Sequence, residues 1–325
     1  MMASRAPSLA AKAETMAASG RVPEAVLALN QLAARGDADA LFTLGMWRLA
    51  GQFVPLDLGA ARDLFRRAGE AGRTDAAIIH TNFLASGVGG APDWKAAMAR
   101  LEALARTDAR SKAQLKLIRK MELTEDGAPL AMPKGELCSP SPHVERFPGL
   151  LTPAECDYLA AAAAPMLKPS LVVDERSGRQ VPHPIRSSDG AIFSWLLANP
   201  AVHALNRRMA AASATHVDQG EPLQILRYRP GQQYKAHYDA LAGLKNQRIM
   251  TLLVYLNDDY RGGETRFLKA GLSLKGRKGE GLLFRNTLAD GRPDPMSEHA
   301  GLPVTAGVKL IASRWIRAEP FVPPG

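Results

Sequence analysis

The stretch from Leu223 to Arg317 alternates between apolar and polar residues with a period of two, and this pattern limits the fold more than any other feature. Alternate side chains of a strand point to the same face, so each apolar run has one face to bury. Short runs separated by Pro-Gly, Asn-Asp, Gly-Gly and Asp-Gly turns predict antiparallel sheets packed as a double-stranded β-helix, or jelly roll. The expected strands lie near 223–228, 233–239, 249–256, 264–268, 281–285, 303–305 and 308–317.

Two residues on one of these strands carry metal-ligand chemistry. His237 and Asp239 are two positions apart, so their imidazole and carboxylate point to the same face and can reach one ion. His299, sixty residues later, is placed to return on another strand of the same sheet. Two histidines and one carboxylate form the facial triad of non-haem Fe(II) oxygenases, although zinc hydrolases use the same ligand types. A rival pair, His216 and Asp218, is flanked by Gly and Pro and is expected in a turn outside the sheet.

Lys309 helps to separate the two metal chemistries. It lies in an alternating apolar run, which points its ammonium into the interior of the fold. A buried lysine is costly unless an anion meets it. A dicarboxylate co-substrate of an oxygenase would supply that anion, whereas a simple hydrolase has no such requirement.

Four segments then carry a family resemblance: LQILRYRPGQQYKAHYDA, RIMTLLVYLNDDYRGGETRF, KGEGLLFRNT and SEHAGLPVTAGVKLIASRWIR. In order and spacing they resemble the catalytic half of the prolyl 4-hydroxylase family of 2-oxoglutarate- and Fe(II)-dependent dioxygenases, over roughly residues 146 to 320. The resemblance implies iron ligands at His237, Asp239 and His299, and a 2-oxoglutarate carboxylate partner at Lys309. It also implies co-substrate contacts at Tyr228 and Thr265. Matched positions of the substrate groove are Arg186, Tyr234, Arg248 and Trp315.

The activity implied by this resemblance is hydroxylation of a C–H bond, most directly in a prolyl residue of a peptide or protein. Fe(II), 2-oxoglutarate, O2 and L-ascorbate are the implied cofactors, with succinate and CO2 as products. The loop after Asp239, ALAGLKNQ, is short and lacks the aromatic residue of many relatives, so a non-prolyl substrate stays open. The other alternative is an interaction adaptor whose oxygenase half is inactive.

The N-terminal third contains an internal repeat with an offset of 36 residues. Ala25, Gly36 and Ala40 recur as Ala61, Gly72 and Ala76, and Asp57 with Ala60 and Ala61 recurs as Asp93 with Ala96 and Ala97. Small residues at a fixed period indicate stacked helix pairs, because they let paired helices approach closely. These segments resemble Sel1-like repeats, relatives of the tetratricopeptide class. Such an array either grips the protein substrate or stabilises the catalytic domain.

The expected organisation is an α+β multidomain chain with a helical repeat domain at 1–120 and a linker at 121–145. The linker is rich in Pro, Gly and Ser. An oxygenase domain with flanking helices follows at 146–325. Its first helix should begin at Thr152, where Pro153 and Glu155 complete a capping box, and a second outer helix should span 199–212.

Composition favours a cytoplasmic protein without nucleic acid or membrane partners. The net charge of +9 is spread along the chain without a basic run. No apolar stretch reaches the roughly 18 residues of a membrane span. The first residues lack the continuous apolar segment of a secretory signal, and their content of Arg, Ser and Ala leaves an organelle transit peptide as an alternative. Only Cys138 and Cys156 are present, which fits a reducing compartment.

Overall fold

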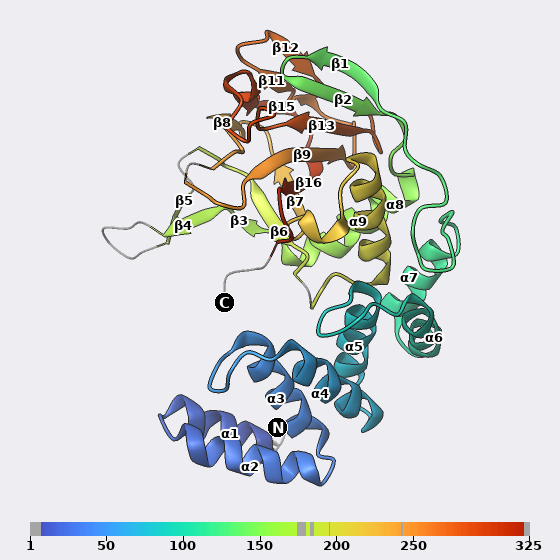
Figure 1. Ribbon diagram of the computed structural model, residues 1–325, viewed down its shortest axis with the longest axis vertical. Coiled ribbons are helices and arrows are strands. Elements are labelled where there is room, and N and C mark those ends of the chain that lie inside the picture. Colours follow the sequence, from blue (N-terminus) through green and yellow to red (C-terminus); the bar gives the residue numbers. More distant parts are fainter. Residues whose placement is uncertain (1–7, 174–179, 183–184, 195, 242, 322–325) are drawn as a thin grey trace.

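The computed structural model describes residues 8–173, 180–182, 185–194, 196–241 and 243–321. The described N-terminal part is helical, and each helix packs against the next in the chain (Figure 1). The helices are α1 (Leu9–Ala18), α2 (Val22–Ala34), α3 (Ala38–Ala50), α4 (Leu58–Glu70), α5 (Thr74–Ser86), α6 (Trp94–Leu104) and α7 (Ala109–Ile118).

The residues that recur at an offset of 36 have matching structural roles. Asp57 and Asp93 are the N-caps of α4 and α6, and each carboxylate accepts a hydrogen bond from a backbone N–H three residues later. Gly36 and Gly72 follow helices in the left-handed region, at φ of 80° and 95°. The recurring alanines have no exposed surface where helices meet: Ala25, Ala40, Ala61 and Ala76.

The C-terminal part is built mainly from antiparallel strands. Its larger sheet has the order β1-β2-β13-β9-β16-β7-β6-β3, and a smaller sheet has the order β12-β11-β14-β8. The larger sheet comprises β1 (Glu136–Pro140), β2 (His143–Phe147), β3 (Lys168–Pro169), β6 (Asp189–Ile192), β7 (Gln224–Tyr228), β9 (Arg248–Tyr255), β13 (Gly281–Arg285) and β16 (Lys309–Arg317). The smaller sheet comprises β8 (Tyr234–His237), β11 (Thr265–Phe267), β12 (Leu272–Leu274) and β14 (His299–Gly301). Two short pairs, β4 (Leu171–Val173) with β5 (Gln180–Pro182) and β10 (Arg261–Gly262) with β15 (Val304–Ala306), complete the described strands.

The larger sheet has an apolar core on each face. One core joins β7, β9 and β16 to helices α8 (Pro153–Ala163) and α9 (Pro200–Ala212). The other includes Leu226, Tyr255 and Ile311 from the larger sheet and Phe267 from the smaller one. The two sheets therefore face each other across a shared interior.

Both expected outer helices are present. The Thr152 hydroxyl accepts a hydrogen bond from the Glu155 N–H, and the Glu155 carboxylate accepts one from the Thr152 N–H. This capping box at the start of α8 confirms the sequence prediction. Asn199 caps α9 by accepting a hydrogen bond from the Val202 N–H.

The expected linker contains secondary structure that its composition did not indicate. Residues of β1 and β2 pair as a hairpin, and β2 also pairs with β13. The hairpin is difficult to predict from the sequence because its strands are short and the segment contains two prolines. The hairpin is ordered by the pairing of β2 with β13 of the larger sheet. Strands β12 and β14 were likewise not among the expected apolar runs.

The helices and the sheets meet at α9, which contacts both α5 and α7. At this junction the Asn82 amide of α5 donates a hydrogen bond of 2.7 Å to the Leu196 carbonyl, just before α9. Leu196 itself packs against the apolar core of the helical part. The junction is thus both apolar and hydrogen-bonded.

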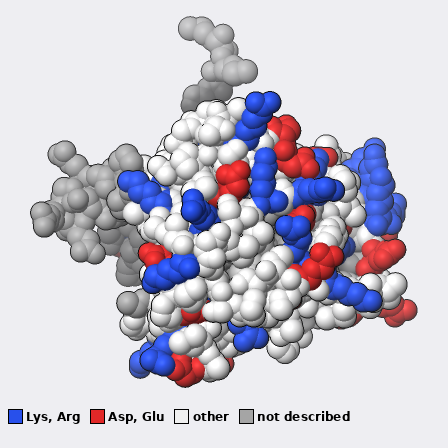
Figure 2. Space-filling view, turned by 90° about the horizontal axis from the view of Figure 1, so that it is seen from above, with Lys and Arg blue, Asp and Glu red and all other residues white. Residues whose placement is uncertain are grey.

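Figure 2 shows one face on which basic and acidic side chains are interspersed. Within the described residues, no helix has the length and apolar character to cross a membrane.

Candidate active site

The predicted metal ligands come together on the smaller sheet. His237 ends β8 and His299 begins β14, and the two residues are directly paired in the sheet register. Asp239 lies two residues beyond His237, on the same side of the chain. One ligand atom from each residue lies within 4.8 Å of the other two. Among the described residues that can ligate a metal, these three form such a group, whereas His216 lies exposed at the start of a 3-10 turn.

The hydrogen bonds of both imidazoles prepare them to bind a cation. The Nδ1–H of His237 donates to the Lys235 carbonyl at 2.8 Å, and that of His299 donates to the Ser297 carbonyl at 2.9 Å. These tautomers leave unprotonated Nε2 atoms 3.5 Å and 3.7 Å from the two carboxylate oxygens of Asp239. Lone pairs that face a carboxylate need a cation between them, so the donor set fits a divalent metal such as Fe(II).

Burial keeps the charges of this cluster in the ligating state. Removal from water lowers the pKa of His299 to about 4, so its ring is neutral at pH 7. Burial alone would raise the pKa of Asp239. The two imidazoles and the Thr251 hydroxyl lower it by a larger amount, so the net pKa lies below its usual range. The group is therefore a carboxylate.

A buried polar pair behind Asp239 was not predicted from the sequence. The Thr251 hydroxyl on β9 donates to the Asp239 carboxylate at 2.6 Å, and the Asn286 amide donates to the Thr251 oxygen at 2.9 Å. Both residues are buried, with 1% and 0% of their surface exposed. The available signal was a threonine on the buried face of an otherwise apolar run, MTLLVY.

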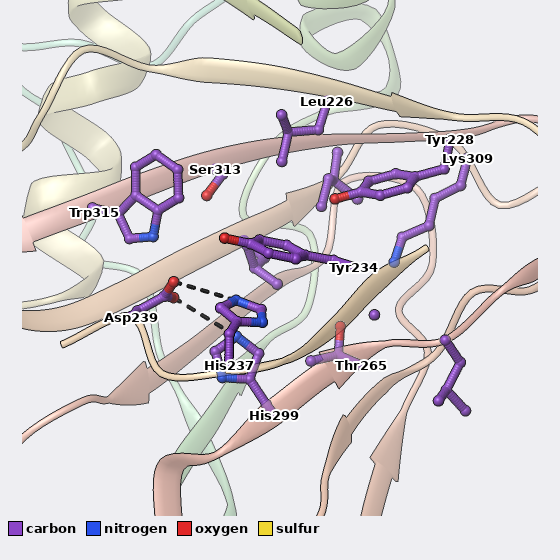
Figure 3. A pocket seen from close by; sticks show the side chains of 14 residues that line it. Leu226, Tyr228, Tyr234, His237, Asp239, Thr265, His299, Lys309, Ser313 and Trp315 are labelled. Atoms are coloured by element: carbon purple, nitrogen blue, oxygen red, sulfur yellow. Dashed lines mark ion pairs between the residues drawn. The ribbon is translucent and has the colours of Figure 1, made fainter. Parts of the chain in front are cut away.

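Lys309 projects into the same pocket as the triad (Figure 3). It opens β16 opposite Tyr228 of β7 and is 3% exposed. Its ammonium donates to the Gly263 carbonyl at 2.6 Å, and the described residues include no carboxylate within 4.0 Å of it. Burial lowers the pKa of Lys309 from 10.5 to about 8, with smaller effects from Glu264 and Lys275. The ammonium has three N–H donors and gives one to Gly263, so the others can bind an anion.

The backbone beside Lys309 depends on glycine. Gly262 and Gly263 adopt φ of 68° and 72°, a left-handed backbone conformation that favours glycine. A Cβ at Gly263 would lie 3.1 Å from the Lys309 side chain. The close approach of this turn lets the Gly263 carbonyl accept the hydrogen bond from the Lys309 ammonium.

Tyr228 and Thr265, the predicted co-substrate contacts, are buried and line the pocket. The Tyr228 ring centre is 5.7 Å from the Lys309 nitrogen. The Thr265 hydroxyl is 3.4 Å from the Tyr255 hydroxyl. In Figure 3 both side chains lie at the Lys309 end of the pocket.

The predicted substrate residues are divided between the pocket and its surroundings. Tyr234 and Trp315 line the pocket, and the Tyr234 ring stacks on His237 at 3.6 Å. Arg248 and Arg186 are outside the lining, but each contacts a residue within it. The Arg248 guanidinium lies 4.2 Å above the Trp315 ring, and that of Arg186 lies 5.6 Å from the Tyr234 ring.

Glu221 organises the arginine over Trp315 and was also not predicted. Its two oxygens accept hydrogen bonds of 2.6 Å and 2.8 Å from Arg248. Arg317 approaches the same carboxylate at 2.6 Å. The carboxylate thus fixes Arg248 beside the pocket.

Two imidazoles, a carboxylate and a buried ammonium in one pocket fit the site of an Fe(II) oxygenase that uses a dicarboxylate co-substrate. Comparisons with known proteins agree with this class. Residues 223–317 match the 2OG-Fe(II) oxygenase superfamily. Prolyl 4-hydroxylase 1 of Arabidopsis thaliana is 37% identical over 205 residues, which cover 57% of this chain and 72% of that protein. Prolyl 4-hydroxylase 2 of the same plant is 34% identical over 209 residues, with coverages of 56% and 70%.

Two solved structures are also similar. A viral collagen prolyl hydroxylase from Paramecium Bursaria Chlorella virus-1, in a 2OG complex, has 30% identity and a TM-score of 0.44, over 54% of this chain and 96% of that one. A Pseudomonas putida prolyl-4-hydroxylase has 19% identity and a TM-score of 0.40, over 54% and 92%.

The chain belongs to the prolyl 4-hydroxylase family of 2OG-Fe(II) oxygenases. It is a 2-oxoglutarate-dependent dioxygenase, whose family uses Fe(II), 2-oxoglutarate and O2. Ascorbate is typical of prolyl 4-hydroxylases.

Proposed function

We propose that this protein hydroxylates a C–H bond of a prolyl residue in a peptide or protein, with release of succinate and CO2. The observation that carries the proposal is the convergence of three metal-ligating groups and the Lys309 ammonium in one pocket. Identity to plant prolyl 4-hydroxylases supports the choice of substrate.

Each residue at the metal end has a role that follows from its chemistry. His237, Asp239 and His299 would hold Fe(II), and Lys309 would bind the distal carboxylate of 2-oxoglutarate. When bound, iron and 2-oxoglutarate activate O2 and supply the oxidising power that hydroxylates the substrate. The protein contributes orientation, because Thr251 fixes the Asp239 carboxylate and backbone carbonyls fix both imidazoles.

The residues at the co-substrate and substrate ends exclude water and align the target. Tyr228 and Thr265 would surround 2-oxoglutarate next to Lys309. Tyr234 and Trp315 present aromatic surface to a substrate ring or chain. Arg186 and Arg248 would contact the peptide outside the pocket.

An anaerobic titration tests the cofactor assignment. Fe(II) and 2-oxoglutarate added to the protein should give a weak visible charge-transfer band, which His237→Ala should abolish. His216→Ala is the matched control and should retain the band. Absence of the band in correctly folded wild-type protein would favour the adaptor alternative. Activity that persists without O2, requires His237 and tolerates Lys309→Ala would instead indicate a zinc hydrolase.

Mass spectrometry tests the substrate. Cell extract incubated with enzyme, Fe(II), ascorbate and 2-oxoglutarate should yield peptides that gain one oxygen at proline, and omission of 2-oxoglutarate should prevent the gain. Oxygen on another residue type would assign a non-prolyl substrate. The loop after Asp239 is the reason to test for a non-prolyl substrate. It has no aromatic residue and exposes Leu241 and Leu244 instead.

We propose further that the helical part, residues 1–120, is a Sel1-like repeat array that docks the protein substrate. The facing sheets would form a double-stranded β-helix, or jelly roll, in the oxygenase domain expected at 146–325. The β1–β2 hairpin from the expected linker, 121–145, would be part of that domain because it pairs with β13.

We also propose a cytoplasmic location. Cys138 and Cys156 are both free thiols. Burial raises the pKa of Cys156 to about 12, so this thiol is unreactive.

A further inference from the structure

A second charged site lies on the helical part, away from the oxygenase pocket. Three successive helices each contribute one face to a groove with a volume of about 430 Å³. Helical positions three or four residues apart share a face, which is the spacing seen on each helix. This arginine groove is lined by Gly59, Arg62, Asp63 and Arg66 of α4, His80 and Leu84 of α5, and Ala96 and Arg100 of α6.

The groove has more positive than negative charge. Its lining contains three guanidiniums and one carboxylate. Arg66 is neutralised by Asp63 at 2.6 Å and Glu70 at 2.7 Å. Glu70 is also the carboxylate paired with Arg100, at the longer distance of 3.5 Å. Arg62 has no carboxylate within 4.0 Å among the residues that the structure describes, so the three guanidiniums face only the two carboxylates of Asp63 and Glu70 and one positive charge is left over.

Arg62 is also held in place before any ligand binds. Its guanidinium donates to the Ala91 carbonyl at 3.0 Å. A Cβ at Gly90 would lie 2.9 Å from the Arg62 Nη1 atom, so the loop before α6 packs closely on the guanidinium. A side chain that is already ordered loses less conformational entropy on binding.

His80 adds a polar group to the buried side of the groove. It is 5% exposed, and its Nδ1 atom has no hydrogen-bond partner. Burial first, and then the charges of Arg100, Arg62 and Arg66, lower its pKa to about 4. A buried polar atom without a partner is uncommon and costly. In the Nδ1–H tautomer, the neutral ring offers a further hydrogen-bond donor beside the guanidiniums.

We propose that the arginine groove binds carboxylate side chains of an acidic segment in the protein substrate. Guanidiniums form short, charge-assisted hydrogen bonds with carboxylates. The groove crosses successive helices, so an extended peptide can lie along it, and α5 links it to α9 of the catalytic part. The inference rests on the proposed function only in taking the ligand from the protein substrate.

Direct binding to the full chain tests this site without iron. A fluorescein-labelled hexaglutamate peptide should bind in an anisotropy titration, and a hexaglutamine peptide should not. Arg62→Met with Arg100→Met should weaken hexaglutamate binding at least about tenfold, since each variant removes a charged hydrogen bond. Arg106→Met with Arg119→Met removes the same charge from exposed positions outside the groove and should leave the affinity unchanged.

Other outcomes overturn the proposal. Equal losses in both double variants would mean non-specific attraction to a basic protein. Binding of inorganic phosphate without binding of hexaglutamate would mean a site for free anions. If thermal unfolding shows that the Arg62 variant is misfolded, Arg100→Met alone replaces it, and unchanged affinity in that variant would also refute the site.

Turnover separates this inference from the proposed function. With a proline peptide that carries a hexaglutamate tail, the groove variants should raise KM, and with the untailed peptide they should match wild type. Equal KM values for tailed and untailed peptides in the wild-type enzyme would refute docking. If neither peptide is hydroxylated, the prolyl assignment fails, while the anisotropy result still decides the groove.

Discussion

Lys309→Met should make the cofactor-free protein more stable and unable to hold 2-oxoglutarate. Each unit of pKa is worth about 1.4 kcal/mol, so the lowering from 10.5 to about 8 corresponds to a cost of about 3 kcal/mol for the buried ammonium. The substitution also strands the Gly263 carbonyl, which offsets about 1–2 kcal/mol. Methionine has a similar unbranched side chain and leaves little cavity.

The expected net gain of about 1–2 kcal/mol should appear as a higher Tm at pH 7. For a protein of this size it corresponds to roughly 1.5–3 °C in the absence of metal and co-substrate. Lys112→Met is the matched control, because it removes an exposed lysine of α7 that lies outside the pocket. That variant should not gain stability.

The pH dependence has a definite sign. The destabilisation by Lys309 is fully present below pH 8, where the folded and unfolded chains both carry the charge. It declines as pH rises from 8 to 10.5, because the folded protein loses the proton first. The advantage of Lys309→Met should therefore shrink over that interval. A Tm at pH 7 equal to or below that of wild type would refute the argument that the buried ammonium is unneutralised.

Ligand should reverse the order of stability. At 2-oxoglutarate concentrations about 100 times Kd, with Mn(II) in place of iron, the wild-type protein should gain about 2.7 kcal/mol. The Lys309→Met protein should be stabilised by Mn(II) alone and should gain no further stability when 2-oxoglutarate is added. Differential scanning calorimetry with and without 2-oxoglutarate measures both.

Three further outcomes are expected. Thr251→Val removes the hydroxyl that orients Asp239 and should weaken metal binding about 10–100-fold in a Co(II) titration, with little change in 2-oxoglutarate affinity at saturating metal. His237→Ala should eliminate metal binding in isothermal titration calorimetry, whereas His216→Ala should leave it intact, and the reverse result would reassign the ligands. The affinity for 2-oxoglutarate should be constant below pH 8 and fall by up to about tenfold per pH unit above it, because Lys309 must carry its proton to bind an anion. Lys309→Arg, which stays charged, should remove that pH dependence.

The sequence predicted that His237, Asp239 and His299 would converge because the information is local. The spacing of His237 and Asp239 specifies a shared face in any extended strand. His299 required only a second strand of the same sheet, and the register pairs it with His237. The alternation around Lys309 likewise specified an interior direction, since a residue out of phase would face the other side of the sheet.

The supporting residues could not be predicted because their partners are set by strand pairing. Thr251 contacts Asn286 and Asp239, which lie 35 and 12 residues away in the chain. A threonine in an apolar run indicates a buried polar group, but the run does not identify its partner. Glu221 is similar: the sequence does not reveal that two arginines, Arg248 and Arg317, share one carboxylate.

The β1–β2 hairpin was missed for a related reason. Its residues have little alternation of their own, and Val144 and Phe147 become buried only because β13 lies beside them. A strand at the edge of a sheet owes its order to its neighbour. Composition alone therefore identified this segment as a linker.

The pocket is costly to the folded protein in the absence of ligands. Three electron-pair donors face one another, and an ammonium is buried without a carboxylate within 4.0 Å among the described residues. An apolar replacement of Lys309 or of a ligating histidine would relieve part of this cost. A metal and a dicarboxylate relieve all of it together, because the cation satisfies the lone pairs and the anion satisfies the ammonium. The free energy that the fold gives up in forming the pocket is thus recovered on binding. A domain that served only as a scaffold would have no physical reason to carry that cost.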